Sequence, residues 1–122
     1  MRARILAASI CLAALPQVCL ADPTTVYDGH WRVDLETSAG NGKCEKGGSA
    51  VLLIKGARIV GIDRSDITPW GYIDEANTFV GHFLQGDKRM NANGEVRGGF
   101  AYGPWSSPSE YCGGRWTARK ID

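Results

Sequence analysis

The sequence predicts an all-β fold, a small antiparallel up-and-down meander barrel of about eight short strands cross-linked by one disulfide. Three observations favour this fold. No segment after residue 21 shows a sustained helical period, short apolar runs alternate with turn residues at fairly regular spacing, and the chain holds 16 glycines. A two-sheet β-sandwich built from the same strands is the alternative.

Residues 1–21 are predicted to be a signal peptide. A basic start precedes an almost unbroken apolar run at residues 5–15, and Ala21 supplies a small residue before the cleavage site. The run is shorter than the roughly 20 residues that span a membrane. Lipidation of Cys19 is an alternative, although the residues before it lack the small side chain that such processing requires. We therefore expect a single periplasmic or secreted domain at residues 22–122, with no membrane insertion after cleavage.

The charge of this domain argues against two classes of partner. Loss of Arg2 and Arg4 leaves 12 of the 14 basic residues against 13 acidic ones, a net charge of −1. Binding to nucleic acid or to an anionic membrane surface would need a basic excess, so neither is expected.

Two of the four cysteines, Cys11 and Cys19, would leave with the signal peptide. Cys44 and Cys112 remain, and a disulfide is the usual state of such a pair in an exported protein. A metal site is not expected at this pair, because no histidine lies near either cysteine in the sequence.

The first predicted strand covers residues 27–37, where Trp31, Val33 and Leu35 alternate with polar residues and indicate one buried face. Further strands are predicted at residues 50–54, 57–62, 70–73, 78–84, 88–92, 95–102 and 111–119.

Asn93-Gly94 is the strongest hairpin signal in the chain, because both residues tolerate the left-handed conformation of a two-residue turn. A turn at this position puts Phe100 and Tyr102 in the strand that follows, with Phe100 in the core. It leaves Trp105 in the next loop.

Connection lengths favour closure of the sheet into a barrel. Connections of a meander alternate between its two ends, and the three longest loops fall at the same end. Cys44 follows the first strand at that end, and Cys112 enters the last strand there. A disulfide between them would place the first and last strands side by side, as a closed barrel requires.

The motif Gly29-His30-Trp31 on the first strand, together with Arg115 and Arg119 on the last, resembles the calycin group of barrels, the avidin-like and lipocalin-like proteins. More closely, the chain is similar to small exported proteins of bacteria. These share an early Gly-x-Trp, a cysteine after the first strand and a closing Cys-x-Gly-x-Trp-x-Ala, here at residues 112–118. The resemblance implies export and the fold, and it implies no activity.

The sequence shows no catalytic constellation. The two histidines, His30 and His82, each lie within a predicted strand, and no serine or cysteine is placed by sequence to act with them. Asp63 and Asp66 lack the ligand spacing of a calcium loop. We therefore expect no enzyme activity, no catalytic residue, no bound metal and no cofactor.

The candidate binding residues are Trp70, Tyr72, Tyr102 and Trp105, which are expected near the long-loop end of the barrel. Exposed aromatic residues beside long loops can mark a surface for a protein or glycan partner. The sequence thus predicts a non-enzymatic binding or inhibitory module that acts through a loop-rich aromatic rim. In the alternative, these side chains plug the barrel end, and the protein is a structural or envelope-associated one without a small ligand.

The inward-facing residues are expected to fill the barrel. An eight-stranded barrel is only just wide enough for its own side chains, and the inward candidates include Trp31, Phe100 and Trp116. The sequence therefore predicts no cavity of ligand size.

Overall fold

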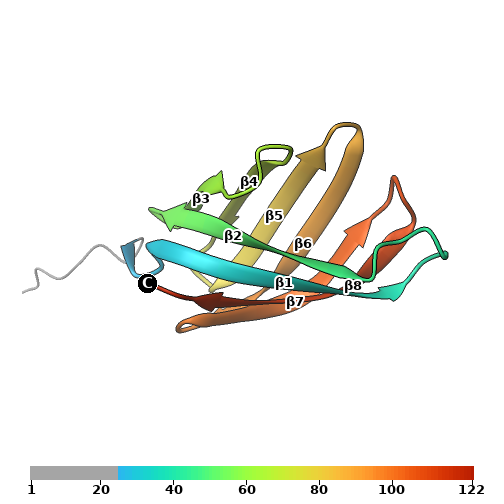
Figure 1. The fold of residues 1–122 in the computed structure, drawn as a ribbon. Helices are drawn as coiled ribbons and strands as arrows, with labels where there is room; N and C mark the ends of the chain where they lie inside the picture. Colours follow the sequence, from blue (N-terminus) through green and yellow to red (C-terminus); the bar gives the residue numbers. More distant parts are fainter. Residues whose placement is uncertain (1–24) are drawn as a thin grey trace, which may run out of the picture.

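The computed structural model of the protein describes residues 25–122. The predicted signal peptide and Cys19 lie outside the described residues. Within them, antiparallel strands follow one another in sequence order and close into a barrel, in which the first strand pairs with both the second and the last (Figure 1). This arrangement confirms the predicted barrel and excludes the sandwich.

The strands are β1 (Gly29–Ala39), β2 (Gly47–Lys55), β3 (Arg58–Ile62), β4 (Thr68–Ile73), β5 (Thr78–Gln85), β6 (Lys88–Arg97), β7 (Phe100–Ser107) and β8 (Cys112–Lys120). Connections 40–46, 63–67, 86–87 and 108–111 meet at one end of the barrel, which we call the long-loop end. Connections 56–57, 74–77 and 98–99 meet at the other, which we call the short-turn end.

Closure between β1 and β8 has the predicted form. Leu35 lies opposite Trp116 and Val33 opposite Ala118 in an antiparallel register. At the long-loop end, Cys44 and Cys112 form a disulfide with their Cα atoms 5.9 Å apart, within the usual range for such a bond. The predicted pairing of these cysteines is confirmed.

The predicted hairpin at Asn93-Gly94 is wrong. Both residues lie inside β6, where Asn93 is opposite Val80 of β5, and the chain turns instead at residues 98–99, with Gly98 at a φ of +61°. The role of Gly94 is to allow close packing between strands, and it does not form a turn. A Cβ atom at this position would lie 2.7 Å from Cζ2 of Trp116 and would overlap the carbonyl oxygen of Tyr102.

Moving the turn changes which residues of β7 face the barrel interior. Ala101, Gly103, Trp105 and Ser107 are buried and face inward. Phe100 faces outward and is 37% exposed, so its predicted place in the core is wrong. Trp105 belongs to the strand and not to a loop.

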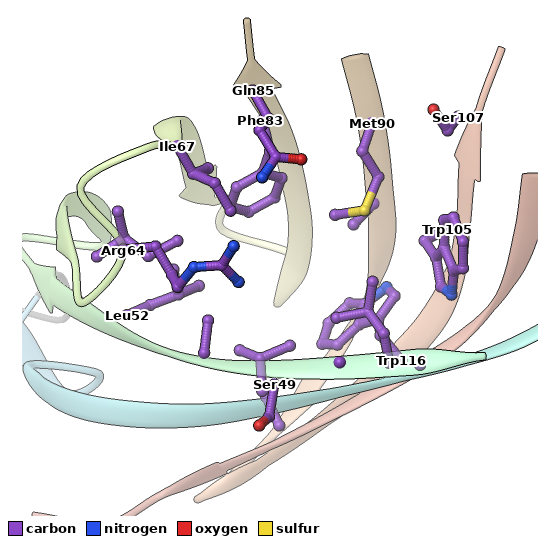
Figure 2. Close-up of a pocket in the computed structure, with 18 of the residues that line it drawn as sticks. Ser49, Leu52, Arg64, Ile67, Phe83, Gln85, Met90, Trp105, Ser107 and Trp116 are labelled. Carbon is purple, nitrogen blue, oxygen red and sulfur yellow. The ribbon is translucent and has the colours of Figure 1, made fainter. Parts of the chain in front are cut away.

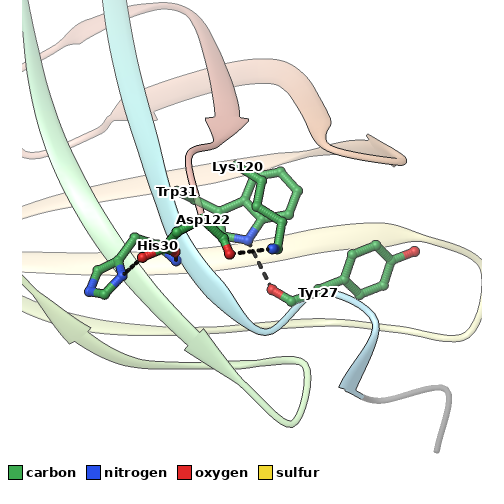
Figure 3. Close-up of polar contacts among 5 residues, drawn as sticks. All are labelled: Tyr27, His30, Trp31, Lys120 and Asp122. Atoms are coloured by element: carbon green, nitrogen blue, oxygen red, sulfur yellow. Dashed lines mark hydrogen bonds and ion pairs between the residues drawn. The ribbon is translucent and has the colours of Figure 1, made fainter. Parts of the chain in front are cut away.

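The core fills the barrel toward the short-turn end. Trp31 and Trp116 are each 4% exposed, and the ring of Phe79 meets that of Trp116 edge to face at 5.4 Å. Tyr27 packs against this core from just before β1, and its carbonyl accepts a hydrogen bond of 2.9 Å from Nε1 of Trp31 (Figure 3). A hydrogen bond from the Tyr27 hydroxyl to Asn77 ties this segment to the β4–β5 turn.

Candidate functional site

A cavity of about 310 Å³ lies inside the barrel, between the core and the long-loop end (Figure 2). Its walls are mainly apolar and include Leu35, Leu52, Phe83, Met90 and Trp105. The prediction of a filled barrel is therefore wrong, since ligand sites begin at roughly 300 Å³.

Two features of the sequence leave this space open. Many inward residues that line it are small, among them Gly48, Ala50, Ala92, Ala101 and Ser107. In addition, Phe100 would have occupied interior volume, and it faces outward while its small neighbour Ala101 faces inward.

The cavity opens at the long-loop end. Its lining there includes the exposed residues Lys43, Glu45, Gln85 and Lys88. At the opposite end, the buried core around Trp31 closes it. A ligand would therefore enter from the side of the long loops.

The buried polar groups of the three inward tryptophans already have hydrogen-bond partners. Nε1 of Trp105 donates to the carbonyl of Glu36 at 3.1 Å, and Nε1 of Trp116 donates to the carbonyls of Asn93 and Pro104, each at 3.1 Å. Nε1 of Trp31 donates to Tyr27. A polar solute in the cavity would thus exchange hydrogen bonds with water for contact with apolar walls, at a net cost. The interior favours an apolar ligand.

A hydrogen-bonded cluster holds one side of the opening. Nε and Nη2 of Arg64 donate to the two carboxylate oxygens of Asp66 at 3.2 and 3.1 Å, and Nε2 of Gln85 donates to Oδ2 of Asp66 at 2.6 Å. These bonds, from Gln85 first and Arg64 second, lower the pKa of Asp66. They tie the β3–β4 loop to the end of β5. Figure 2 shows the guanidinium of Arg64 directed from this loop into the cavity.

Charged side chains surround the opening, with cations in excess. The cavity lining contains the cations Lys43, Arg64, Lys88 and Arg89 and the carboxylates Glu45 and Glu110. Of these, only Arg64 makes an ion pair within residues 25–122, and its partner Asp66 does not line the cavity. The other three cations are therefore free to meet a ligand.

The four aromatic residues predicted to form a binding rim do not come together. Trp105 is buried, with 9% exposure, and lines the cavity. Trp70 and Tyr72 lie on the outer face of β4 with ring centroids 5.5 Å apart, and Tyr102 lies three strands away on the outer face of β7, against Phe100. No common rim joins them. Binding through Trp70 and Tyr72 stays a prediction.

Neither histidine lies in the cavity lining. The amide of His30 donates to Oδ1 of Asp122, and Nδ1 of His30 lies 2.6 Å from Oδ2 of the same residue (Figure 3). These contacts, the amide bond first and the ring second, lower the pKa of Asp122. On the outer face of β5, Nδ1 of His82 lies 2.6 Å from Oδ1 of Asn91, and the ring of His82 stacks on Trp70 at 5.2 Å. Residues 25–122 contain no cluster of side chains suited to hold a metal ion.

The sequence did not predict that Leu52, Phe83 and Met90 line a cavity and so belong to a candidate site. A signal was present in the small residues that alternate with outward-facing ones along β2, β6 and β7, such as Ala50 and Ala92. Small inward residues on several strands indicate unfilled volume once the strands are known to close on one another.

No protein-family model matches the chain, and no curated protein matches it. Among the residues that the structure describes, no helix has the length and apolar character needed to cross a membrane.

Proposed function

We propose that this protein is an exported, non-enzymatic binding module that holds a small apolar ligand inside its barrel. The observation that carries the proposal is the cavity of about 310 Å³, with its apolar wall and its opening among the long loops. The disulfide between Cys44 and Cys112 supports export, because such bonds persist in oxidising compartments such as the periplasm or the extracellular space.

The cavity limits both ligand size and affinity. Its volume lies at the lower end of the range for small-molecule sites, so the ligand is a compact ring system or a short acyl chain. Burial of each side-chain-sized apolar group contributes about 1.5–3 kcal/mol, and association costs several kcal/mol. A ligand with a few such groups would bind with a dissociation constant on the order of micromolar to millimolar.

The test uses N-phenyl-1-naphthylamine, an uncharged dye whose fluorescence rises in apolar surroundings. We expect purified protein comprising residues 22–122 to bind the dye saturably. Ala50 lines the cavity, so Ala50→Phe should fill part of it and weaken dye binding by about tenfold, as loss of one buried group predicts.

The matched control is Ala76→Phe, which places the same side chain at an exposed position in the β4–β5 turn at the short-turn end. Binding by this variant should equal that of the wild type. Absence of saturable binding to the wild type, or equal binding by both variants, would contradict the proposal.

The outer face of β4 supports a second candidate function, recognition of a protein or glycan partner. Trp70 is 50% exposed there and stacks on His82, and Tyr72 lies beside it. Exposed aromatic rings of this kind stack on sugar rings and anchor protein contacts. Loss of partner capture in Trp70→Ala, with dye binding unchanged, would favour this function over the cavity.

A further inference from the structure

We propose that the ligand is an amphiphile, an apolar body with a single anionic head group, and that the head group binds at the cavity opening beside Arg64 and Lys88. This inference rests on the proposed function and specifies the class of ligand. It follows from the place of the polar groups along the cavity, from the distribution of charge around the opening, and from the geometry of Arg64.

The depth at which a head group can bind is set by the available hydrogen-bond donors. Beside the opening, the hydroxyl of Ser107 already donates to the carbonyl of Arg89 at 2.6 Å. Deeper in the cavity, the indole N–H groups of Trp105 and Trp116 donate to backbone carbonyls. An anion buried there would lose its hydration without replacement, which is strongly unfavourable. A charged head group must therefore stay at the opening.

Charge divides the opening into two sides. The cations Arg64, Lys88 and Arg89 come from the β3–β4 loop and the start of β6. The β1–β2 and β7–β8 connections, which the disulfide joins on the other side of the barrel, contribute the carboxylates Glu45 and Glu110 and one cation, Lys43. That side of the lining is therefore net negative. An anionic group would be attracted to the side of Arg64 and repelled from the side of Glu45 and Glu110.

Arg64 is held in place and retains free donors. Its Nε and Nη2 atoms each donate one hydrogen bond to Asp66, and a hydrogen bond from Gln85 holds Asp66 in place. A guanidinium has five N–H donors, so the remaining ones can bind a carboxylate or sulfonate while the pair with Asp66 stays intact. Figure 2 shows this guanidinium pointing into the cavity and not away from the barrel.

Lys88 supplies the second cation. It is the first residue of β6 and lies two positions before Met90, which is part of the cavity wall, so both side chains project to the same face of the strand. Its ammonium makes no ion pair within residues 25–122. An acyl chain against Met90 would thus bring its head group within reach of Lys88.

The test compares decanoate with 1-decanol, which share the same chain and differ in head-group charge, as competitors of bound N-phenyl-1-naphthylamine at pH 8 and below micelle-forming concentrations. We expect decanoate to compete about fivefold better than decanol, as a partly exposed charged contact predicts. The preference should shrink at high salt, because exposed charges are screened.

Substitutions test which residues cause the preference for decanoate over decanol. Arg64→Gln and Lys88→Gln should each reduce it, and together they should abolish it, so that decanoate competes no better than decanol in the double variant. The control Lys55→Gln removes an exposed lysine at the short-turn end and should leave the preference unchanged. Arg64→Lys should retain part of it.

The outcomes separate the two proposals. Equal competition by decanoate and decanol, with saturable dye binding, would overturn the anionic head group and leave the apolar cavity in place. A preference that persists in the double variant would overturn the role of Arg64 and Lys88. Failure of the wild type to bind dye or either competitor would overturn the proposed function itself.

Discussion

At the scale of single residues, glycines shape this barrel in two different ways. Gly98 has a φ of +61° in the β6–β7 turn, a conformation that L-residues rarely adopt. Gly94 has no such φ, and its lack of a side chain leaves room for the Trp116 indole and for the backbone of β7. One glycine turns the chain, and the other allows close packing.

The difference leads to a prediction for Gly94→Ala. Its methyl group would meet the backbone carbonyl of Tyr102 and the Trp116 ring, and backbone cannot move aside as a flexible side chain can. Overpacking of this kind typically costs about 1–3 kcal/mol, so urea denaturation should show a loss of stability of at least that size. Gly48→Ala is the control, because a Cβ atom at Gly48 has no neighbour within 4 Å. Equal stability of the two variants would contradict this account.

The same pair of glycines shows where sequence reasoning stops at the residue scale. Asn93-Gly94 has the local chemistry of a tight turn, and nothing in its neighbourhood along the chain indicates otherwise. The competing demand comes from Trp116, which lies on another strand. A turn preference is local, whereas a close approach depends on the completed fold, so the sequence alone favoured the wrong function for Gly94.

At the scale of elements, that single misplaced turn explains most of the errors at the predicted site. Placing it too early removed Trp105 from β7 and put Phe100 on the inner face. The number of strands, their order and the ends at which the loops gather were predictable, because they depend on alternation and on connection lengths. The cavity was not, because its volume depends on which face each residue of β6 and β7 presents.

One seam of the barrel is weaker than the others. Between β3 and β4 the register contains a single pair, Arg58 opposite Tyr72, followed by a hydrogen bond from the amide of Ile73 to the carbonyl of Ala57 at 2.9 Å. Backbone amides of alternate residues point toward the same neighbouring strand. Because the amide of residue 73 points toward β3, the amide of residue 69 should point toward β3 as well. Pro69 has no N–H to donate, and pairing ends before it is reached.

We therefore predict uneven hydrogen exchange around the barrel. Peptides covering residues 58–71 should exchange their amide hydrogens faster than peptides covering residues 112–120, because β8 is paired along its length with both β1 and β7. Mass spectrometry of exchanging native protein measures this directly. Equal protection of the two segments would show that the β3–β4 seam is as firmly closed as the rest.

At the scale of the whole molecule, stability depends on how the first and last strands are held together. The register between β1 and β8 joins them along most of their length, and the disulfide adds a covalent link at the long-loop end. Both cysteines also line the cavity, so the disulfide stabilises one side of its opening as well as the junction of the first and last strands. Fold stability and the shape of the cavity opening are thus linked through one structural feature.

The last prediction concerns the double variant Cys44→Ser/Cys112→Ser. Its cysteines are 68 residues apart in sequence, and a loop of that length gives a chain-entropy stabilisation of about 4 kcal/mol, a large share of the roughly 5–15 kcal/mol expected for a small domain. The variant should still fold into the barrel, because backbone pairing of β1 with β8 does not need the disulfide, but its melting temperature should fall by more than about 10 °C.

Dye binding by the same variant should weaken as well, because release of the 40–46 loop loosens the carboxylate side of the opening. Wild-type protein should react with a thiol reagent only after reduction. Full labelling of unreduced native protein would contradict the disulfide, and an unchanged melting temperature in the double variant would show that strand pairing alone sets the stability of the barrel.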